Sequence, residues 1–435
     1  MFLLITLKVK INMKLIKTTP SLKEYRLSDF LENKTKKTKP DINKEFFDLS
    51  NIESGEYFKK KQKNVPLDIK SDLIIVEKGD LVYGKCRPNL DKAILAEEEG
   101  QTTTEALVYS SNYSGFFLAI LHSKEFINYN INNATGSKMP RTSNKNVLDY
   151  KFNAPIDIDF NKTGSYLLDF ANNIENIKDL IKKLEIRNQY YAEKIISGEL
   201  RVNENHSEDL KLYNNTEWED QILKNTFSTK EYRIPKGWKI EKLLDNVKLI
   251  KGTSINSSEF NYQSLGCQFL RTGDVWEDTS SKKEPAYFDG IVDDKFLKKE
   301  DDYLSCFEGF NKIIGDGTIG LVTNVGEGII SSHLYKTENQ KIDGKYYGVS
   351  LIKTDYIQNI LIRNAVGSTV LSSTKCLKDI IFIFPEEEEM KLIENALSPL
   401  YLEVNNLRRL LKKEQLRFQW LLDNLLSGEY KVVED

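Results

Sequence analysis

The segment from Ile174 to Val202 reads IENIKDLIKKLEIRNQYYAEKIISGELRV, and the segment from Val404 to Val432 reads VNNLRRLLKKEQLRFQWLLDNLLSGEYKV. When their Ser-Gly-Glu endings are superposed, Gly198 falls on Gly428, an offset of 230 residues (428 − 198). A self-similarity of this length predicts an internal repeat. At this offset Lys182, Lys183, Arg187, Gln189 and Val202 coincide with Lys412, Lys413, Arg417, Gln419 and Val432.

Apolar residues in both segments recur with a spacing of three and four, which predicts two long helices that pack along their length. Asn188 interrupts the apolar seam in the first copy and Glu414 in the second. Gly198 and Gly428 follow the last seam residues, where a glycine commonly ends a helix. Two unrelated surface helices could share the periodicity, but periodicity does not require the common ending or the Lys-Lys pair. The first seam is Leu167, Phe170, Ile174, Ile177, Ile181, Leu184, Tyr191 and Ile195; the second is Leu397, Leu400, Val404, Leu407, Leu411, Phe418, Leu421 and Leu425.

The repeat extends beyond the helices. Residues 133–137 (NATGS) match residues 364–368 (NAVGS) at an offset of 231, and a helix is predicted before each of these turns. Downstream, Phe152 to Pro155 matches Phe382 to Pro385, and each reads as a strand closed by a proline. More loosely, Phe47 to Ile52 parallels Phe269 to Val275. The order of predicted elements is therefore the same in both halves.

These patterns predict an α+β fold in which two mixed α/β globules are separated by two long, antiparallel, coiled-coil-like helices, with a pseudo-twofold internal repeat. Each globule has enough residues to bury its own core. We expect a first globule at 13–164, a first long helix at 165–202, a polar linker at 203–234, a second globule at 235–394 and a second long helix at 395–433.

Composition narrows the class of protein. The four cysteines are scattered without Cys-x-x-Cys spacing, and the three histidines are equally isolated, so neither a metal site nor a disulfide framework is predicted. Scattered cysteines fit a reducing cytoplasm. The opening residues MFLLITLKVKINMK are too short and too charged to span a membrane, and Met13 is an alternative start of the protein.

Motifs for catalysis are missing from the sequence. There is no G-x-x-x-x-G-K-[ST] phosphate loop, no Gly-x-Ser-x-Gly elbow and no His-Glu-x-x-His. Gly315 to Gly320 carries several glycines, but Asp316 would present negative charge to a phosphate, so a turn between strands is the better interpretation. The Asn/Asp-Pro-Pro-aromatic motif that grips a flipped base is also lacking. The chain is therefore predicted to bind rather than to catalyse.

Two similar modules joined by rigid helices suit a target with two separated parts. The first seam covers 29 positions (Leu167 to Ile195), which is roughly 43 Å of helix and about a dozen base pairs of duplex DNA. The loops after Gly136 and Gly367 differ in sequence, and their basic, amide and hydroxyl side chains can read base edges. An ordinary solvated turn is an equally good interpretation of any single residue. The predicted DNA-binding residues are Lys85, Arg87, Lys138, Arg141, Thr142, Asn144, Lys145, Arg271, Thr272, Ser368, Thr369, Ser372, Ser373 and Lys375, and the predicted helix-pairing residues are Ile174, Ile177, Ile181, Leu184, Val404, Leu407, Leu411 and Phe418.

From Met13 to Val433 the layout resembles the specificity (S) subunit of a type I restriction-modification enzyme. The resemblance is carried by the Gly237-Trp238 pair, by Gly136-Ser137 and Gly367-Ser368 ahead of the Phe-x-x-Pro strands, and by the two helices that end in Ser-Gly-Glu. The first globule departs from the pattern, because Tyr25-Arg26-Leu27 stands where the second globule has Trp238-Lys239-Ile240.

The resemblance implies a non-catalytic subunit of a host-defence complex for DNA restriction and methylation. Each globule would be a target recognition domain that reads one half of a bipartite site. The helices would set the spacer and dock two modification (methyltransferase) subunits. S-adenosylmethionine, ATP and Mg²⁺ would bind to the modification and restriction subunits, with no cofactor in this chain. The net charge of −3 is unusual for a solitary DNA binder, so partner subunits would supply part of the phosphate contact.

Two other interpretations stay open. A two-module coiled-coil scaffold or adaptor that binds proteins would show the same seam, and sequence-dependent binding to duplex DNA would distinguish it. A fused methyltransferase or nuclease fragment is disfavoured by the missing cofactor and base-gripping motifs.

Overall fold

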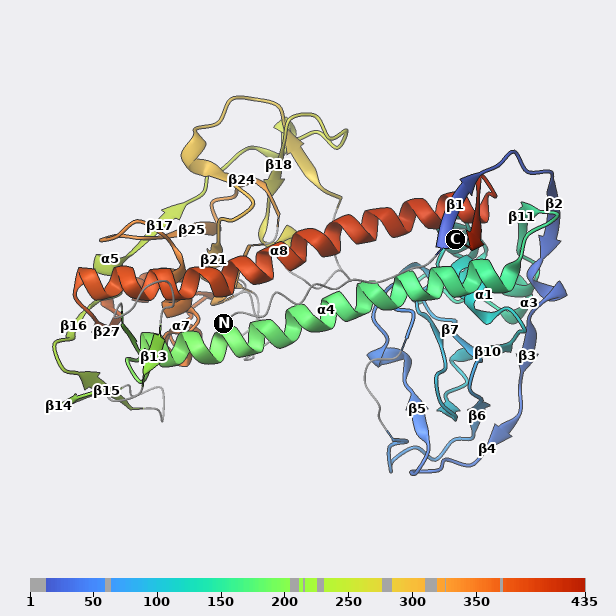
Figure 1. Cartoon of the computed structure of the whole chain (residues 1–435), viewed down its shortest axis with the longest axis horizontal. Helices are drawn as coiled ribbons and strands as arrows, with labels where there is room; N and C mark the ends of the chain where they lie inside the picture. The colour runs from blue at the N-terminus through green and yellow to red at the C-terminus, as the bar shows by residue number, and fades with distance from the viewer. Residues whose placement is uncertain are drawn as a thin grey trace. The chain divides into compact units, whose positions relative to one another are not determined.

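The computed structural model describes residues 13–58, 64–203, 211–213, 216–224, 231–275, 284–309, 319–324, 326–367 and 371–434. The described residues form two compact units. The first unit runs up to Leu180 and resumes at Arg409, and the second unit is Ile181–Arg408. Two long helices, α4 (Phe160–Ile196) and α8 (Glu387–Leu426), each give one half to each unit (Figure 1). The alternative start at Met13 concerns residues 1–12, which lie outside the described residues.

The first unit is built on two four-stranded sheets that enclose an apolar core. One sheet is antiparallel, in the order β3-β10-β7-β8, and the other is β4-β6-β9-β5, in which β5 and β9 run parallel. Phe47, Val82 and Ile94 are among the fully buried side chains of this core. The strands are β3 (Glu32–Lys34), β4 (Lys37–Thr38), β5 (Glu45–Phe47), β6 (Leu73–Val76), β7 (Leu81–Gly84), β8 (Ala93–Leu95), β9 (Gly100–Thr102) and β10 (Ala106–Ser110).

A second apolar core of the first unit joins its helices to the long helices. Helix α1, buried along Phe116 to Leu121, packs with Leu167 and Phe170 of α4 and with Leu421 of α8. Two strand pairs, β2–β11 and β1–β28, complete the unit (Figure 1). The bounds are α1 (Ser114–Leu121), α2 (Lys124–Asn133), α3 (Asn144–Leu148), β1 (Met13–Lys17), β2 (Leu22–Arg26), β11 (Lys151–Pro155) and β28 (Tyr430–Glu434).

The second unit repeats this plan except at one edge of its second sheet, where β19 pairs with β18, whereas β4 of the first unit pairs with β6 at the opposite edge. Its antiparallel sheet, β17-β25-β21-β23, has the order of β3-β10-β7-β8. Its other sheet is β19-β18-β24-β20, in which β18 and β24 run parallel, as β5 and β9 do in the first unit. The strands are β17 (Val247–Lys251), β18 (Cys267–Leu270), β19 (Ala286–Phe288), β20 (Leu297–Lys298), β21 (Leu304–Cys306), β23 (Leu321–Thr323), β24 (Gly328–Ile330) and β25 (Leu334–Asn339).

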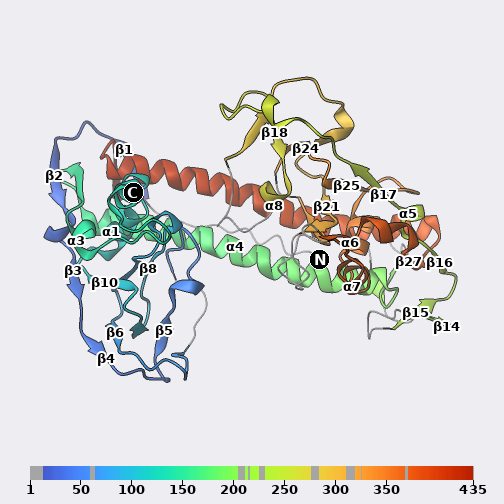
Figure 2. The same ribbon diagram turned by 180° about the vertical axis from the view of Figure 1, so that it is seen from behind.

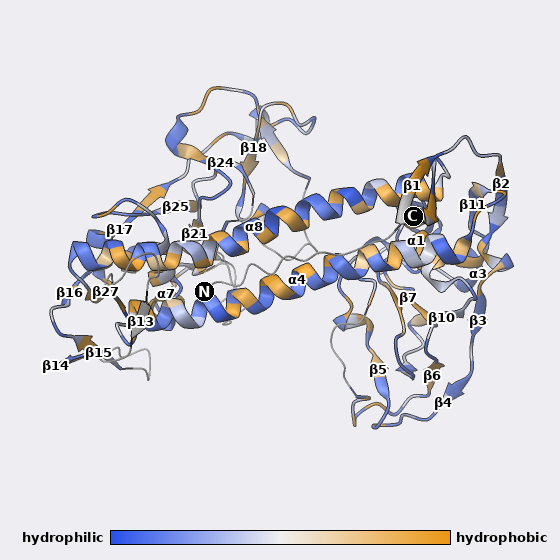
Figure 3. Ribbon diagram, viewed as in Figure 1, coloured by the Kyte–Doolittle hydropathy of each residue, from blue (hydrophilic) through white to orange (hydrophobic). Residues whose placement is uncertain are grey.

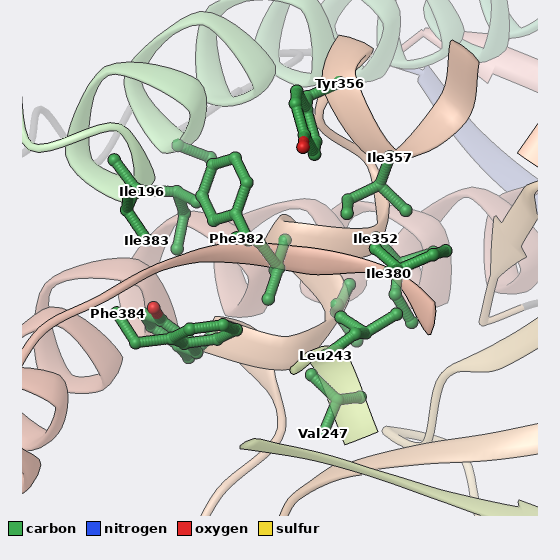
Figure 4. Close-up of a cluster of buried hydrophobic side chains, with 14 of the residues drawn as sticks. Ile196, Leu243, Val247, Ile352, Tyr356, Ile357, Ile380, Phe382, Ile383 and Phe384 are labelled. Atoms are coloured by element: carbon green, nitrogen blue, oxygen red, sulfur yellow. The ribbon is translucent and has the colours of Figure 1, made fainter. Parts of the chain in front are cut away.

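Two helices, α6 and α7, follow the antiparallel sheet of the second unit, as α1 and α2 follow that of the first, while α5 precedes the sheet. Figure 2 shows α6 and α7 beside the antiparallel sheet. The Phe382 side chain of β27 lies in the apolar core close to Ile196 at the end of α4 and to Tyr356 of α7 (Figure 4). The bounds are α5 (Leu243–Asn246), α6 (Tyr346–Ile352), α7 (Asp355–Arg363), β16 (Lys239–Lys242), β22 (Glu308–Gly309), β26 (Leu371–Ser372) and β27 (Ile381–Phe384).

The two long helices are amphipathic, with apolar stripes that show in orange in Figure 3. Among the predicted helix-pairing residues, Leu407 and Leu411 are only partly buried, and the buried ones are Ile174, Ile177, Ile181, Leu184, Val404 and Phe418. In the second unit the two helix halves run antiparallel. This follows from their hydrogen bonds, which join Asn188 to Leu400, Arg187 to Glu403 and Glu185 to Arg408. Asn188 does not weaken the seam, because its amide donates to the Leu400 carbonyl (2.7 Å).

One seam assignment was wrong. Tyr191 is 37% exposed, and Ala192 is buried in its place. A straight helix has 3.6 residues per turn, so its buried face drifts relative to a 3.5-residue repeat, and after Asn188 the seam advances by four residues. Both helices also begin before their predicted starts, at Phe160 and Glu387. The start of α8 carries Glu387, Glu388 and Glu389, which suit the positive end of the helix dipole.

The glycines that end the long helices are required for two reasons. Gly198 and Gly428 have φ of 73° and 74°, a conformation that favours glycine. A Cβ at Gly198 would lie 2.2 Å from Cγ of Pro235, and one at Gly428 would lie 2.1 Å from Cγ of Pro155. The predicted glycine ends are therefore confirmed.

The segment predicted as a linker, 203–234, contains strands. Strand β12 (Arg201–Asn203) pairs with β13 (Lys211–Tyr213), and β14 (Trp218–Leu223) pairs with β15 (Tyr232–Pro235). Strand β14 is exposed along most of its length, so it shows no apolar alternation by which a sequence pattern could identify it. The Thr216 hydroxyl donates to the Gly198 carbonyl (2.8 Å), as Thr18 does to Gly428 (2.6 Å).

Strand registers also correct two alignments. Phe152 opposes Tyr25 and Phe382 opposes Glu241, so Tyr25 corresponds to Glu241 and not to Trp238. Likewise, Phe47 opposes Thr102 and Leu270 opposes Ile330, which aligns Phe47 with Leu270 instead of Phe269. Insertions between the repeated elements change the number of residues that separates equivalent positions. The equivalent positions are therefore identified from the strand registers and not from one constant offset.

Candidate nucleic-acid interface

In the first unit two predicted segments come together at the end of β7. Thr135 and Arg141 exchange both backbone hydrogen bonds (2.9 Å each), which closes the 135–141 loop into a tight hairpin. This hairpin lies along the residues after β7, because the Arg87 N–H donates to the Pro140 carbonyl (2.7 Å) and the Thr142 N–H to the Lys85 carbonyl (3.0 Å). We call Lys85, Arg87, Lys138 and Arg141 the first loop cluster.

Three basic side chains of this cluster, Arg87, Lys138 and Arg141, are exposed to solvent, and Lys85 is partly buried. Gly136 has φ of 98°, which allows the hairpin to turn. Arg87 has φ of 52°, an unfavourable conformation for a residue with a side chain. Its bond to Pro140 holds that conformation, and the Arg87 side chain is exposed. Lys138 and Lys145 are exposed as well.

Arg141 is held only weakly. Its guanidinium pairs with Glu105 (Nη2–Oε2 3.0 Å), and both side chains are about half exposed. An exposed ion pair contributes roughly 0–1 kcal/mol, so a phosphate or a guanine can replace Glu105 at little cost.

Two predicted DNA-binding residues instead support the hairpin from inside. Thr142 is 4% exposed, and its hydroxyl donates to Oδ1 of buried Asn130 (2.5 Å). Asn144 accepts a hydrogen bond from the Tyr109 hydroxyl (2.9 Å). In this structure both side chains fix the loop to the core, and any contact they make with DNA stays a prediction.

The second unit forms the equivalent loop with different side chains. Val366 and Ser372 exchange the two hydrogen bonds that Thr135 and Arg141 exchange in the first unit. Ser373 is buried, and its N–H and hydroxyl both donate to the Phe307 carbonyl (2.9 and 3.1 Å). Lys375 is exposed. The predicted residues Ser368 and Thr369 lie outside the described residues.

Arg271 and Thr272 lie beside β21. Two hydrogen bonds join the Arg271 guanidinium to the Asp274 carboxylate (2.7 and 2.9 Å) and raise the pKa of Arg271. Burial raises the pKa of the Cys306 thiol to about 11, while a hydrogen bond with Thr272 acts in the opposite direction. Both predicted residues therefore have partners within the protein.

Sequence reasoning missed three ionisable side chains at these loops. Glu105 pairs with Arg141 in the first unit, and Glu308 pairs with His333 in the second. Glu105 directly precedes β10, which leads to α1, and His333 directly precedes β25, which leads to α6. Their position before a predicted strand could have drawn attention to them, but their partners are distant in sequence and only strand pairing reveals them.

A metal-binding cluster and a membrane-spanning helix are both absent from the residues with assigned positions. No group of three or more His, Cys, Asp or Glu side chains among them could hold a metal ion. None of the helices among them is both long enough and apolar enough to cross a membrane.

No family model and no curated protein matches this sequence. Among solved structures, the chain is similar to the type I restriction-modification system S subunit from M. genitalium, with 11% identity over 94% of this chain and 97% of that one and a TM-score of 0.53. It is also similar to the HsdS subunit from Thermoanaerobacter tengcongensis (14% identity, 94% and 97% covered, TM-score 0.35). A third similar chain comes from a structural study of complex assembly and conformational transition of the type I R-M system (15% identity, 95% and 100% covered, TM-score 0.39). The predicted α+β class is confirmed, and the chain has the fold of the M. genitalium S subunit.

Proposed function

We propose that this chain is the non-catalytic, sequence-specific DNA-binding subunit of a type I restriction-modification complex, in which each unit reads one half of a bipartite site. One observation carries the proposal: the antiparallel sheets of both units have the same strand order, yet the equivalent loops beside them carry different side chains. Shared topology with different loops is the arrangement expected of two readers with different half-sites.

The two loops differ in the chemistry that reads bases. The first loop cluster offers Arg87 and Arg141, which suit guanine and phosphate. In the second unit Ser372 takes the place of Arg141. Each closes the same hairpin, Arg141 with Thr135 and Ser372 with Val366, and each pairs with the strand segment after the equivalent sheet strand, at Cys86 and Glu308. A hydroxyl accepts and donates at several base edges. The two half-sites are therefore expected to differ, which makes the whole site asymmetric.

The long helices suit the role of a spacer. Helix α4 has 37 residues and α8 has 40, and at about 1.5 Å per residue each extends over roughly 55–60 Å. In the proposal, the part of each helix between the modules sets the number of unread base pairs. Inserting whole helical turns after Leu184, with matching turns in α8, should lengthen the spacer and leave both half-sequences unchanged.

Each long helix also carries an exposed apolar pair at the same place in the repeat. Ile186 and Tyr190 are 73% and 59% exposed on α4, and Leu416 and Trp420 are 67% and 43% exposed on α8. The second pair lies 230 residues after the first, and each pair follows a Lys-Lys dipeptide. Exposed apolar side chains at i and i+4 suit the apolar face of a partner helix. This duplication supports docking of two copies of a modification subunit, which would bring S-adenosylmethionine, with restriction subunits bringing ATP and Mg²⁺ in the cytoplasm.

The same apolar pairs favour the second candidate, a scaffold that binds only proteins. Selection of a random duplex DNA library with the purified full chain separates the two. The proposal predicts an enriched motif of two unlike half-sequences around an unread spacer. A chain that enriches no motif, at low salt where phosphate contacts are strongest, would overturn the DNA-binding role and leave the scaffold.

A further inference from the structure

The two antiparallel sheets place one residue of each unit in the same position. In the first unit Ala106 of β10 opposes Gly84, and in the second Leu334 of β25 opposes Cys306. Glu105 directly precedes β10 and His333 directly precedes β25. His333 is therefore the structural counterpart of Glu105.

The neighbouring bridges extend this equivalence to the partners of the two residues. Cys86 bridges Arg141 in the first unit, and Glu308 pairs with Ser372 in the second. Glu308 thus stands where the first unit has Cys86, and Ser372 stands where it has Arg141.

An acid–base pair consequently occupies the same place in both units, with its parts exchanged. In the first unit the strand start supplies the acid, Glu105, and the hairpin supplies the base, Arg141 (3.0 Å). In the second unit the strand start supplies the base, His333, whose Nδ1 lies 2.5 Å from Oε2 of Glu308. The basic side chain therefore comes from a different element in each unit.

Stability does not account for the second pair. The His333 side chain is 62% exposed and that of Glu308 is 22% exposed. Exposed ion pairs contribute roughly 0–1 kcal/mol. What the pair does fix is the ring: a Glu308 carboxylate at Nδ1 sets its orientation, and Nε2 has no hydrogen-bond partner among the described residues.

We propose that His333, positioned by Glu308, is a specificity-determining residue that reads a guanine in the half-site bound by the second unit. This inference rests on the proposed function. Glu308 accepts the Nδ1 proton, and when the ring carries a second proton on Nε2, that N–H can donate to O6 or N7 of guanine, the acceptors that Arg141 suits in the first unit. Glu308 acts through His333 and is a positioning residue.

The test is selection of a random duplex library with four full-length proteins: the wild type, His333→Ala, Glu308→Gln and Lys248→Ala. Lys248 is the matched control, since it forms an exposed ion pair with Glu338 near the opposite end of β25 (3.0 Å, 50% exposed). His333→Ala should lose roughly 5- to 150-fold discrimination at one guanine of one half-sequence, as expected for a single base contact. Glu308→Gln should weaken the same position less, and Lys248→Ala should select the wild-type motif. All four proteins should melt within a few degrees of one another.

Three results would overturn the inference. If His333→Ala selects the wild-type motif unchanged, His333 reads no base, and the proposed function stands. If both half-sequences weaken equally, His333 acts on affinity and not on sequence. If the wild type itself selects no motif, the proposed function fails, and the inference fails with it.

Discussion

The first and second units hold the helix after their antiparallel sheet in opposite ways. In the first unit Gly164 of α4 lies against the start of α1, so close that a Cβ there would be 2.5 Å from the Phe116 nitrogen. In the second unit Glu394 of α8, 230 residues later, accepts hydrogen bonds from the backbone N–H groups of Tyr346 and Tyr347 (3.1 and 2.7 Å) at the start of α6. One unit joins helix to helix by close backbone packing, and the other by a buried carboxylate.

This difference shows what the repeat preserves. The place where a long helix meets the short helix is the same in both units, but the side chains that make the junction are not. Packing geometry constrains the location, because the antiparallel sheets and their strand order are shared. The chemistry at the junction is free to diverge, as it does at the equivalent loops around Arg141 and Ser372.

The largest effect is expected from removing the buried carboxylate. Glu394→Ala leaves the N–H groups of Lys345, Tyr346 and Tyr347 and the Asn339 amide without their acceptor. Unsatisfied buried donors cost about 1–3 kcal/mol each, partly offset where water enters, so a loss of at least about 3 kcal/mol is expected. Thermal unfolding of the variant and the wild type measures this loss in the free energy of unfolding.

Glu403→Ala is the control for Glu394→Ala. Glu403 lies on the same helix but pairs with Arg187 at the surface (2.7 Å, 32% exposed), so its loss should cost under about 1 kcal/mol. Equal losses in the two variants would show that Glu394 does not cap α6 in solution.

The next largest effect is expected at the glycines that end the two long helices, a feature that both units share. Gly198→Ala and Gly428→Ala should each destabilise the protein by about 2–4 kcal/mol, because a left-handed conformation and a proline contact both oppose a side chain. Gly237 has φ of 84° but no atom within 4 Å of an added Cβ. Gly237→Ala should therefore cost only about 1–2 kcal/mol, the conformational part alone. Chemical denaturation of the three variants measures their free energies of unfolding. If Gly237→Ala destabilises the protein as much as the other two, the proline contact does not contribute to their cost.

Several of these features follow from the sequence alone. The paired glycines and most of the seam could be predicted because helix periodicity and helix ends are local signals. Tyr191 was misplaced because a heptad count ignores helical drift. Strand β14 could not be predicted, because an exposed strand has no alternation of apolar and polar residues in its sequence.

The candidate site was less predictable than the fold. The basic hairpin around Arg141 could be identified by its composition, but composition does not distinguish outward Arg141 from inward Thr142. The pairing of Glu308 with His333, 25 residues apart in sequence, depends on the register of a sheet. The sequence also gives no sign that Lys298, in a short strand, is buried.

Lys298 offers the smallest effect and the last comparison between the units. It opposes Gly328 as Val76 opposes Gly100, so the second unit buries a lysine where the first buries a valine. Burial lowers the pKa of Lys298 to about 8, against 10.5 in its absence. The folded state therefore releases its proton before the unfolded state does. The cost of burying the charge is present in full below about pH 8 and disappears as the pH rises toward 10.5.

Lys298→Met keeps the length of the side chain and removes the charge. It should raise the free energy of unfolding at pH 7 by about 1–3 kcal/mol, less whatever the bond from Nζ to the Lys299 carbonyl (3.0 Å) contributes. The wild type should become more stable between pH 8 and 10 relative to Lys298→Met, and the two curves should converge. If the difference between them stayed constant over this range, Lys298 would be charged in the folded protein throughout. The second unit would then tolerate a buried cation at a position where the first buries the hydrocarbon side chain of Val76, and the two cores would differ in polarity as the two loops do.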